Sequence, residues 1–262
     1  MIRYVSFLVG AASGAVFLRE RRRRLSLERL SAATLETLLD AIDANSPETG
    51  AHVRRVADYS LLLARAADLN EKSQKSVERI ALFHDIGKLD GALSDIVNDD
   101  SGLTAAERRA VMTHPRRGAE VLAPLKRFYP DLPEGVLSHH ERWDGKGYPR
   151  HLEGQRIPIA ARVVAIADTF DAITHSRAYR DGRSTDTAIQ ALSEGRGSQF
   201  DPELVDLFLS PPVLDRVRES MEKFRRPQRS KSRRHDGRAK PDAPDISFRW
   251  RTTMPEQQRQ GL

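Results

Sequence analysis

The residues with the clearest potential for chemistry are an adjacent histidine and aspartate, His84 and Asp85, which follow the apolar run from Ile80 to Phe83. An imidazole and a carboxylate in a buried setting each need a partner, and a metal ion can serve both. Lys88 comes one helical turn later, so its ammonium can reach whatever the pair holds. An isolated His-Asp pair is more often a plain helix end, so the interpretation depends on the rest of the chain.

Further metal-binding side chains fall at the ends or faces of successive expected helices. Asp168 is the sharpest case, because it follows the apolar segment 163–167, where an unpaired carboxylate would be costly to bury. Imidazole mixed with carboxylate suits iron, manganese or zinc. The eight predicted ligands exceed what one six-coordinate ion accepts, which predicts at least two ions bridged by Asp85; they are Glu48, His52, His84, Asp85, His114, His139, His140 and Asp168.

The composition and the charge distribution exclude some kinds of site and argue against one class of protein. Its 262 residues include no cysteine, which excludes disulfides and thiolate metal sites. The net charge of +6 is concentrated at the ends, because residues 1–24 carry +5 and residues 221–262 carry +7. The part between them is therefore acidic, at about −6. An acidic middle argues against a domain that binds a specific nucleic acid.

The spacing of apolar residues predicts an all-α chain, since no stretch has the alternation of a strand. Ser46 is expected to cap a helix that has Pro47 in its first turn, and Thr104 with Glu107 forms a capping-box pattern. Helices are expected over residues 25–44, 47–68, 76–83, 104–115, 134–140, 157–173, 186–192 and 202–209.

Several motifs carry a resemblance to a known family. HHERWDGKGYP at residues 139–149 is long and highly specific, and together with HDIGK at 84–88 it resembles the HD-GYP family of bacterial phosphodiesterases. Segments 160–168 and 197–202 match later motifs of that family, and the resemblance runs over about 35–209. It implies an all-helical HD-superfamily fold with two or three divalent metal ions, iron or manganese. It also implies cleavage of cyclic di-GMP to the linear dinucleotide or to GMP.

The resemblance also implies roles for individual residues. All eight predicted ligands match metal ligands of the family, and Glu48 matches the acidic residue of its three-metal members. Asp85 and Lys88 would be the catalytic residues, with Lys88 facing the scissile phosphate. Tyr148 could stack on a base, although its loop is equally well a structural turn. The implied substrate contacts are Lys88, Tyr148, Arg177 and Arg180.

Two departures from the family pattern concern the substrate side of the site. Asp99 and Asp100 stand where a Lys-Pro pair is common, and Ala178 replaces a proline. The alternatives are an HD-superfamily phosphohydrolase acting on another nucleotide and a non-catalytic receptor for cyclic di-GMP or a partner protein. The DGKGYP stretch and Arg177 count against the first, and the filled ligand positions count against the second.

The chain divides into four expected parts. Residues 1–24 form an apolar N-terminal segment with an arginine cluster, and 25–44 form a leading helix that could serve as a homodimer contact. Residues 45–220 form the HD-GYP catalytic domain. Residues 221–262 form a basic tail that is expected to be disordered, because it has few apolar residues to bury.

The expected location is the cytoplasm. The uncharged run 4–18 is short for a membrane span of roughly 20 residues, and the arginines after it would place the rest of the chain on the cytoplasmic side. This run is either an anchor at the inner face of the cell membrane or an amphipathic N-terminus. The two basic ends could contact an anionic membrane surface, attract RNA or DNA without sequence specificity, or remain solvated.

Overall fold

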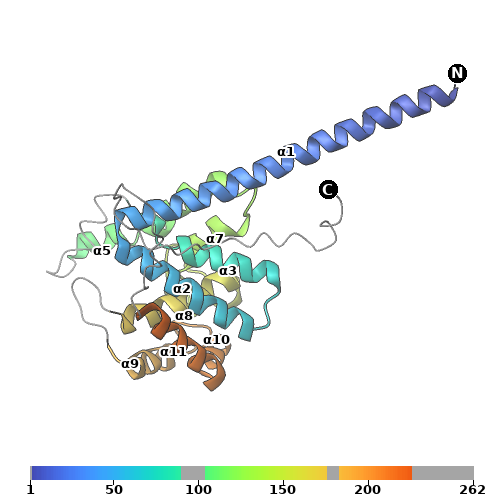
Figure 1. Ribbon diagram of the computed structural model, residues 1–262. Helices are drawn as coiled ribbons and strands as arrows, with labels where there is room; N and C mark the ends of the chain where they lie inside the picture. Colours follow the sequence, from blue (N-terminus) through green and yellow to red (C-terminus); the bar gives the residue numbers. More distant parts are fainter. Residues whose placement is uncertain (1, 90–103, 176–182, 226–262) are drawn as a thin grey trace, which may run out of the picture.

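The computed structural model describes residues 2–89, 104–175 and 183–225, with residues 2–18 described as backbone only. Within those ranges every regular element is a helix (Figure 1), as the sequence predicts. Three short 3₁₀ turns, at Ile86–Lys88, Ala123–Leu125 and Gly154–Arg156, join some of them. The α-helices are α1 (Ile2–Asn45), α2 (Pro47–Ala66), α3 (Glu71–Phe83), α5 (Ala105–Val111), α6 (His114–Leu122), α7 (Asp131–Ser138), α8 (Ile159–Thr174), α9 (Thr185–Gly195), α10 (Pro202–Leu209) and α11 (Pro211–Arg225).

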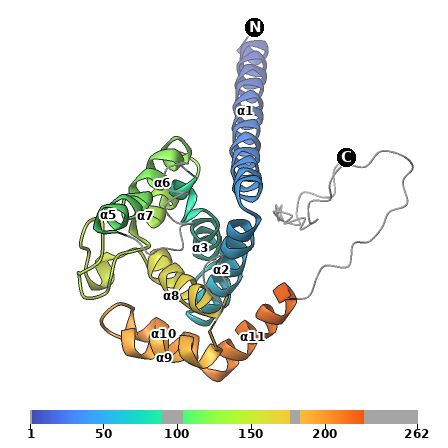
Figure 2. The same cartoon turned by 90° about the vertical axis from the view of Figure 1, so that its left-hand side faces the viewer.

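Helix α2 lies at the centre of the packing. It contacts α1, α3, α8 and α11, and Figure 2 shows these helices around it. Helix α8 is apolar on most of its surface, which suits a helix enclosed by neighbours on several sides. Tyr59 of α2 and Phe208 of α10 both pack edge-on against Phe170 of α8, and all three are fully buried. The core therefore joins the helices that carry the predicted ligands His52 and Asp168.

The local signals at helix starts are confirmed. The Thr49 amide donates to Ser46 Oγ at 3.1 Å, with Pro47 in the first turn of α2. At α5 the Glu107 amide donates to Thr104 Oγ1 and the Glu107 carboxylate accepts from the Thr104 amide, which completes the capping box. These contacts satisfy amides that have no partner inside the helix.

Several expected helix boundaries are wrong; for example, the helix expected over 76–83 begins at Glu71. The helix expected over 104–115 is two helices, because α5 ends at Val111 and α6 begins at His114. Pro115 lies in the first turn of α6, the part of a helix where its missing N–H and bulky ring are tolerated. The break turns His114 into a helix start. At the N-terminus, residues 1–24 and 25–44 are not separated by a helix end, since α1 continues through both.

The N-terminal part of α1 projects from the helical body, and its C-terminal part packs on α2 (Figure 1). Leu35, Leu39 and Ile42 are buried there, at helical spacing. The side chains of the apolar run 4–18 lie outside the described residues, as does the tail beyond Arg225. Among the residues described, no helix combines the length and apolar character needed to cross a membrane.

Helix α11 is an element that the sequence analysis missed. It packs on α2 and α10, and Ser220 Oγ donates a hydrogen bond to the Asp58 carboxylate of α2. Val217 and Met221 are buried one turn apart on its inner face. This periodicity was available in the sequence, but the many charged residues around it resemble the start of the basic tail. The folded part of the chain thus includes residues up to Arg225.

We predict that Met221→Ala lowers the free energy of unfolding by about 2–5 kcal/mol, because it leaves a cavity between α11 and the core. Glu219→Ala, on the exposed face of the same helix, should change it by less than about 0.5 kcal/mol. Urea unfolding followed by circular dichroism measures both. Equal stability of the two variants would show that α11 is an appendage and not part of the core.

Candidate metal centre

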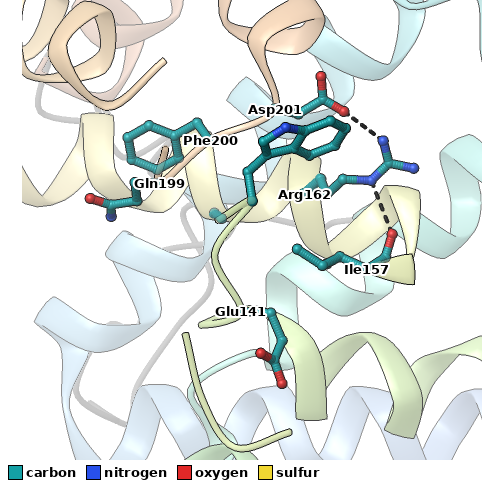
Figure 3. Close-up of a pocket in the computed structure, with 8 residues that line it drawn as sticks. Glu141, Ile157, Arg162, Gln199, Phe200 and Asp201 are labelled. Atoms are coloured by element: carbon teal, nitrogen blue, oxygen red, sulfur yellow. Dashed lines mark hydrogen bonds and ion pairs between the residues drawn. The ribbon is translucent and has the colours of Figure 1, made fainter. Parts of the chain in front are cut away.

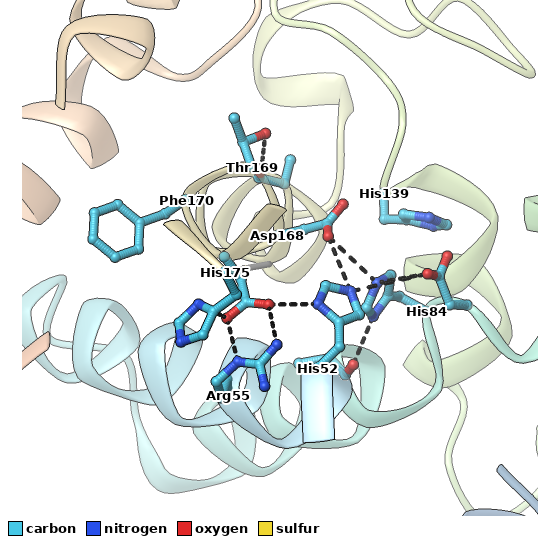
Figure 4. A network of polar contacts seen from close by, with 12 residues as sticks. His52, Arg55, His84, His139, Asp168, Thr169, Phe170 and His175 are labelled. Atoms are coloured by element: carbon cyan, nitrogen blue, oxygen red, sulfur yellow. Dashed lines mark hydrogen bonds and ion pairs between the residues drawn. The ribbon is translucent and has the colours of Figure 1, made fainter. Parts of the chain in front are cut away.

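The predicted ligands meet where several helix ends converge on the middle of α8. His52 comes from α2 and Asp168 from α8, while His84 caps the end of α3 and His139 the end of α7. His114 begins α6. Figure 4 shows His52, His84 and Asp168 facing one another. Side chains at helix ends and on one inner face can therefore reach a common point without distorting the helices.

Asp85 lies between two sets of histidines. Its Oδ2 is 3.5 Å from His84 Nε2 and 4.0 Å from His52 Nε2, and its Oδ1 is 3.3 Å from His114 Nε2. Asp168 Oδ1 is a second oxygen on the first side, 3.3 Å from His52 Nε2 and 3.7 Å from His84 Nε2. The two oxygens of Asp85 thus face different imidazoles, which is the arrangement that a bridging carboxylate needs.

Among the described residues, two groups have ligand atoms within 4.8 Å of one another, close enough to hold one ion each. The first group contains His52, His84 and Asp85, all buried. The second group contains three histidines, whose rings pack together with centroids 4.1 to 5.2 Å apart. These are His114, His139 and His140.

The backbone fixes which nitrogen of three histidines faces the site. Nδ1 of His84, His114 and His139 lies 2.7, 2.7 and 2.6 Å from the carbonyl oxygen three residues earlier. A carbonyl only accepts hydrogen bonds, so each Nδ1 carries a proton and the neutral ring presents the Nε2 lone pair to the site. His114 Nε2 and His139 Nε2 are 3.1 Å apart. Two lone pairs at that distance repel each other unless a cation lies against both.

The buried polar atoms of the first group also fit a cation. Among the residues that the structure describes, His52 Nε2, His84 Nε2 and Asp85 Oδ1 are buried and have no hydrogen-bond partner. A buried polar atom without a partner is costly, and a metal ion would satisfy all three. The residues present therefore fit a metal centre with imidazole and carboxylate ligands.

Charge and burial set the protonation of these groups. Burial lowers the pKa of His114 to about 3 and that of His140 to about 4, which keeps both rings in the neutral form that binds metals. Burial would raise the pKa of Asp85, but nearby positive charge, chiefly that of Lys88, holds it well below its usual range. His52 differs, because the nearby carboxylates of Asp168 and Asp171 outweigh burial and raise its pKa to about 9.

Lys88 lies beside Asp85 as expected, but a 3₁₀ turn places it there and not a further turn of an α-helix. Helix α3 ends at Phe83, and a 3₁₀ turn over Ile86–Lys88 places Lys88 Nζ 2.8 Å from Asp85 Oδ2. The turn packs directly on α6, since a Cβ at Gly87 would lie 2.1 Å from the His114 carbonyl oxygen. Only glycine permits this approach, which brings Asp85 and His114 together.

The Gly-Tyr-Pro loop folds back over His140. The Tyr148 ring stacks on the His140 ring with centroids 4.9 Å apart, and the Tyr148 amide donates to the His140 carbonyl. Glu141 is buried and accepts hydrogen bonds from the amides of Arg150 and Leu152. The loop therefore supports a predicted ligand. Stacking of Tyr148 on a nucleotide base stays a prediction.

The motif at residues 197–202 holds this loop in place. The amides of Trp143 and Asp144 donate to the carbonyls of Gln199 and Ser198 at 3.1 and 2.8 Å. Arg162 of α8 lies over the Trp143 ring and pairs with the buried Asp201 carboxylate. Figure 3 shows Arg162, Gln199 and Asp201 around the small cavity behind the loop. The two motifs are distant in sequence but form one support for His139 and His140.

One predicted ligand, Glu48, is not part of this cluster, and two predicted substrate contacts cannot be placed because they lie outside the described residues. Glu48 lies in the first turn of α2 with an exposed side chain, and neither ligand group includes it. Arg177 and Arg180 lie outside the described residues, as do Asp99, Asp100 and Ala178. The third metal ion and the arginine contacts with substrate therefore stay predictions.

Sequence reasoning missed Asp171 and Arg55. Asp171 is 1% exposed and contacts His52, and Arg55 forms two hydrogen bonds with its carboxylate. Burial would raise the pKa of Asp171, but hydrogen bonds from His175, His52 and Arg55 hold it well below its usual range. A second aspartate in an apolar helix, three residues after Asp168, was the signal that could have indicated a buried role.

Comparisons with known proteins agree with the geometry. A family model described as HD domain matches residues 36–204. The chain is 37% identical to 3′3′-cGAMP-specific phosphodiesterase 2 of Vibrio cholerae over 71% of this chain and 35% of that protein. It is also 37% identical to the cyclic di-GMP phosphodiesterase response regulator RpfG of Xanthomonas campestris, over 72% of this chain and 53% of that protein. The chain thus spans about a third to a half of these relatives.

A solved structure supports the fold. An HDG"Y"P protein from Bdellovibrio bacteriovorus matches with a TM-score of 0.53 at 18% identity, covering 72% of this chain and 62% of that one. At this identity the likeness concerns the fold alone. The family match, in contrast, spans most of the chain and contains every residue of both ligand groups. With its HDIGK and HHERWDGKGYP motifs, the chain belongs to the HD domain family, in its HD-GYP branch.

Proposed function

We propose that this chain is a metal-dependent phosphodiesterase that hydrolyses cyclic di-GMP to the linear dinucleotide or to GMP. The observation that carries the proposal is Asp85, which lies between two groups of histidines and holds Lys88 at 2.8 Å. Membership of the HD domain family and the printed activity of relatives such as RpfG support it. A non-catalytic receptor would have no need of this complete donor set.

The residues of the chain have distinct parts in this reaction. When bound, divalent ions at the two groups would supply a water of lowered pKa and positive charge against the phosphate oxygens. Lys88 is partly exposed, so its ammonium can turn from Asp85 to a phosphate and neutralise charge on the leaving oxygen. Tyr148 keeps His140 in place from the side of the loop.

The metals that we propose are iron or manganese. Five imidazoles and two carboxylates suit these ions better than magnesium, which prefers oxygen ligands and retains its waters. The family is metal-dependent, and both ligand groups are formed by described residues. We propose two ions, one in each group, with Asp85 shared between them.

A second substrate is favoured by a specific observation. Two of the relatives, both from Vibrio cholerae and each 37% identical to this chain, have names that specify 3′3′-cGAMP. Cyclic di-GMP and 3′3′-cGAMP differ in one purine base, and the reacting phosphodiester is of the same kind in both. Discrimination between them must come from contacts with the base, to which Tyr148 and the predicted Arg177 and Arg180 would contribute.

Two further proposals concern partners outside the site. We propose that the basic ends, residues 1–24 and 221–262, bring the protein to the inner face of the cell membrane, because clustered arginine and lysine are attracted to anionic lipid. We also propose that residues 25–44, within α1, mediate a homodimer. The exposed Leu30, next to the segment that packs on α2, supports that proposal.

Turnover tests the proposed activity directly. The purified full chain, loaded with iron or manganese under reducing conditions, is expected to convert cyclic di-GMP to the linear dinucleotide or GMP, followed by chromatography. A parallel reaction with 3′3′-cGAMP measures the preference between the two. If neither cyclic dinucleotide is cleaved by metal-replete protein, the proposed function is wrong.

Metal content tests the proposed centre. Elemental analysis of the loaded chain should give two ions, and Asp85→Ala should retain less than one because its carboxylate serves both groups. Glu48→Gln is the control and should keep both ions, since the exposed Glu48 belongs to neither group. A full complement in Asp85→Ala would contradict the bridging role. Loss of one ion in Glu48→Gln would instead favour three ions.

Lys88→Met should separate binding of metal from chemistry. We expect turnover to fall by about 10²-fold or more, because the variant lacks the ammonium that neutralises the leaving oxygen. Its metal content should equal that of the wild type, since Lys88 belongs to neither ligand group and a protonated ammonium cannot bind a metal. Undiminished turnover would exclude a role for Lys88 in the chemical step.

A further inference from the structure

Asp171 is a buried carboxylate beside the candidate centre that contacts three other side chains. It lies on α8 close to one turn after Asp168, and only 1% of its surface is exposed. Its Oδ2 is 2.7 Å from His52 Nδ1 and its Oδ1 is 3.0 Å from His175 Nδ1. Arg55 donates from Nε to Oδ1 at 2.7 Å and from Nη2 to Oδ2 at 2.9 Å. Figure 4 shows Arg55 and His175 on the side of His52 that is away from His84.

This partner distinguishes His52 from the other histidines of the centre. In three of them, Nδ1 donates a hydrogen bond to a neutral backbone carbonyl; these are His84, His114 and His139. In His52, by contrast, Nδ1 contacts the negatively charged carboxylate of Asp171. A carboxylate behind an imidazole fixes the ring orientation, keeps the proton on Nδ1 and makes Nε2 more basic. His52 Nε2 is therefore the strongest imidazole donor among these four.

Arg55 determines how firmly Asp171 is held. Its two parallel hydrogen bonds engage both carboxylate oxygens, which prevents the carboxylate from rotating away from His52. Arg55 and His52 both belong to α2, three residues apart and so on one face of the helix. The pair is thus anchored on the same helix as the ligand that it orients, while Asp171 comes from the same helix as Asp168.

We propose that Asp171, held by Arg55, is a positioning residue that makes the group of His52, His84 and Asp85 the tighter of the two metal positions. This inference rests on the proposed metal centre and adds to it a ranking of the two positions by metal affinity. In the second group, His114 and His139 are backed by neutral carbonyls instead. Loss of the Asp171 charge should therefore weaken one position and spare the other.

The chain supplies a matched control at the next residue. Arg54 also forms two hydrogen bonds with one carboxylate, from Nη1 and Nη2 to the oxygens of Asp43, each at 2.5 Å. The side chain of Arg54 is 11% exposed and that of Arg55 is 12% exposed. The Arg54 pair joins α2 to α1 and touches no predicted ligand. Lysine at either position keeps the charge but loses the planar fork.

The experiment titrates the metal-free full chain with Mn²⁺ and counts free Mn²⁺ by electron paramagnetic resonance. Wild type should bind two ions with unequal affinity. Asp171→Asn should raise the dissociation constant of the tighter position about 10–100-fold and leave the weaker one unchanged. Arg55→Lys should raise the same constant about 10-fold, and Arg54→Lys should leave both constants as in wild type. Thermal unfolding of the metal-free variants measures the purely structural effect.

Several results would overturn the inference. Wild-type affinity in Asp171→Asn would do so, as would equal effects of Arg54→Lys and Arg55→Lys, or equal weakening of both positions. If Asp171→Asn does not fold, the comparison of the two lysine variants decides by the same criterion. Failure of the wild type to bind Mn²⁺ would refute the metal centre itself, and this inference with it. A wild type that binds two ions but cleaves no cyclic dinucleotide would refute the proposed function alone.

Discussion

A carboxylate removed from water must be compensated by positive charge or by hydrogen-bond donors, and Asp85 is removed from water with the ring nitrogens of several histidines around it. Lys88 supplies one compensating charge, at 2.8 Å. The imidazoles supply none when they present lone pairs, and backbone carbonyls fix three of them in that state. The site is therefore arranged to bind cations. The surrounding helices hold together nitrogen and oxygen lone pairs that repel one another when no cation is present.

The residues that hold the ligands in place differ between the two ligand groups, and this difference affects how firmly each group would bind an ion. On one side, Asp168 contacts His52 and His84, and Asp171 and Arg55 lie behind His52. On the other side, three histidines depend on backbone carbonyls and on the loop that carries Tyr148. The first position is therefore richer in negative charge. An ion there would be bound more firmly, and the second position would be the more exchangeable one.

The long motif is best understood as a support for ligands. Gly147 allows the loop to turn against the backbone of Glu141 and Arg142, and Tyr148 then covers His140. Pairing of Trp143 and Asp144 with residues 198–199 anchors the loop from outside. The sequence between the histidines and the proline thus preserves a shape, which explains why residue type alone gave no chemistry for it.

The sequence by itself determined the helical class, the capped starts of α2 and α5, and the identity of the donors. These depend on properties that are local to the chain, namely apolar spacing, side-chain hydrogen bonding and the chemistry of imidazole and carboxylate. Only the tertiary structure decided which donors meet. His52 and Asp171 are 119 residues apart, and their contact depends on how α2 packs on α8. The packing of α11 on α2 and α10 has the same cause, because it is settled by contacts between helices that are far apart in the sequence.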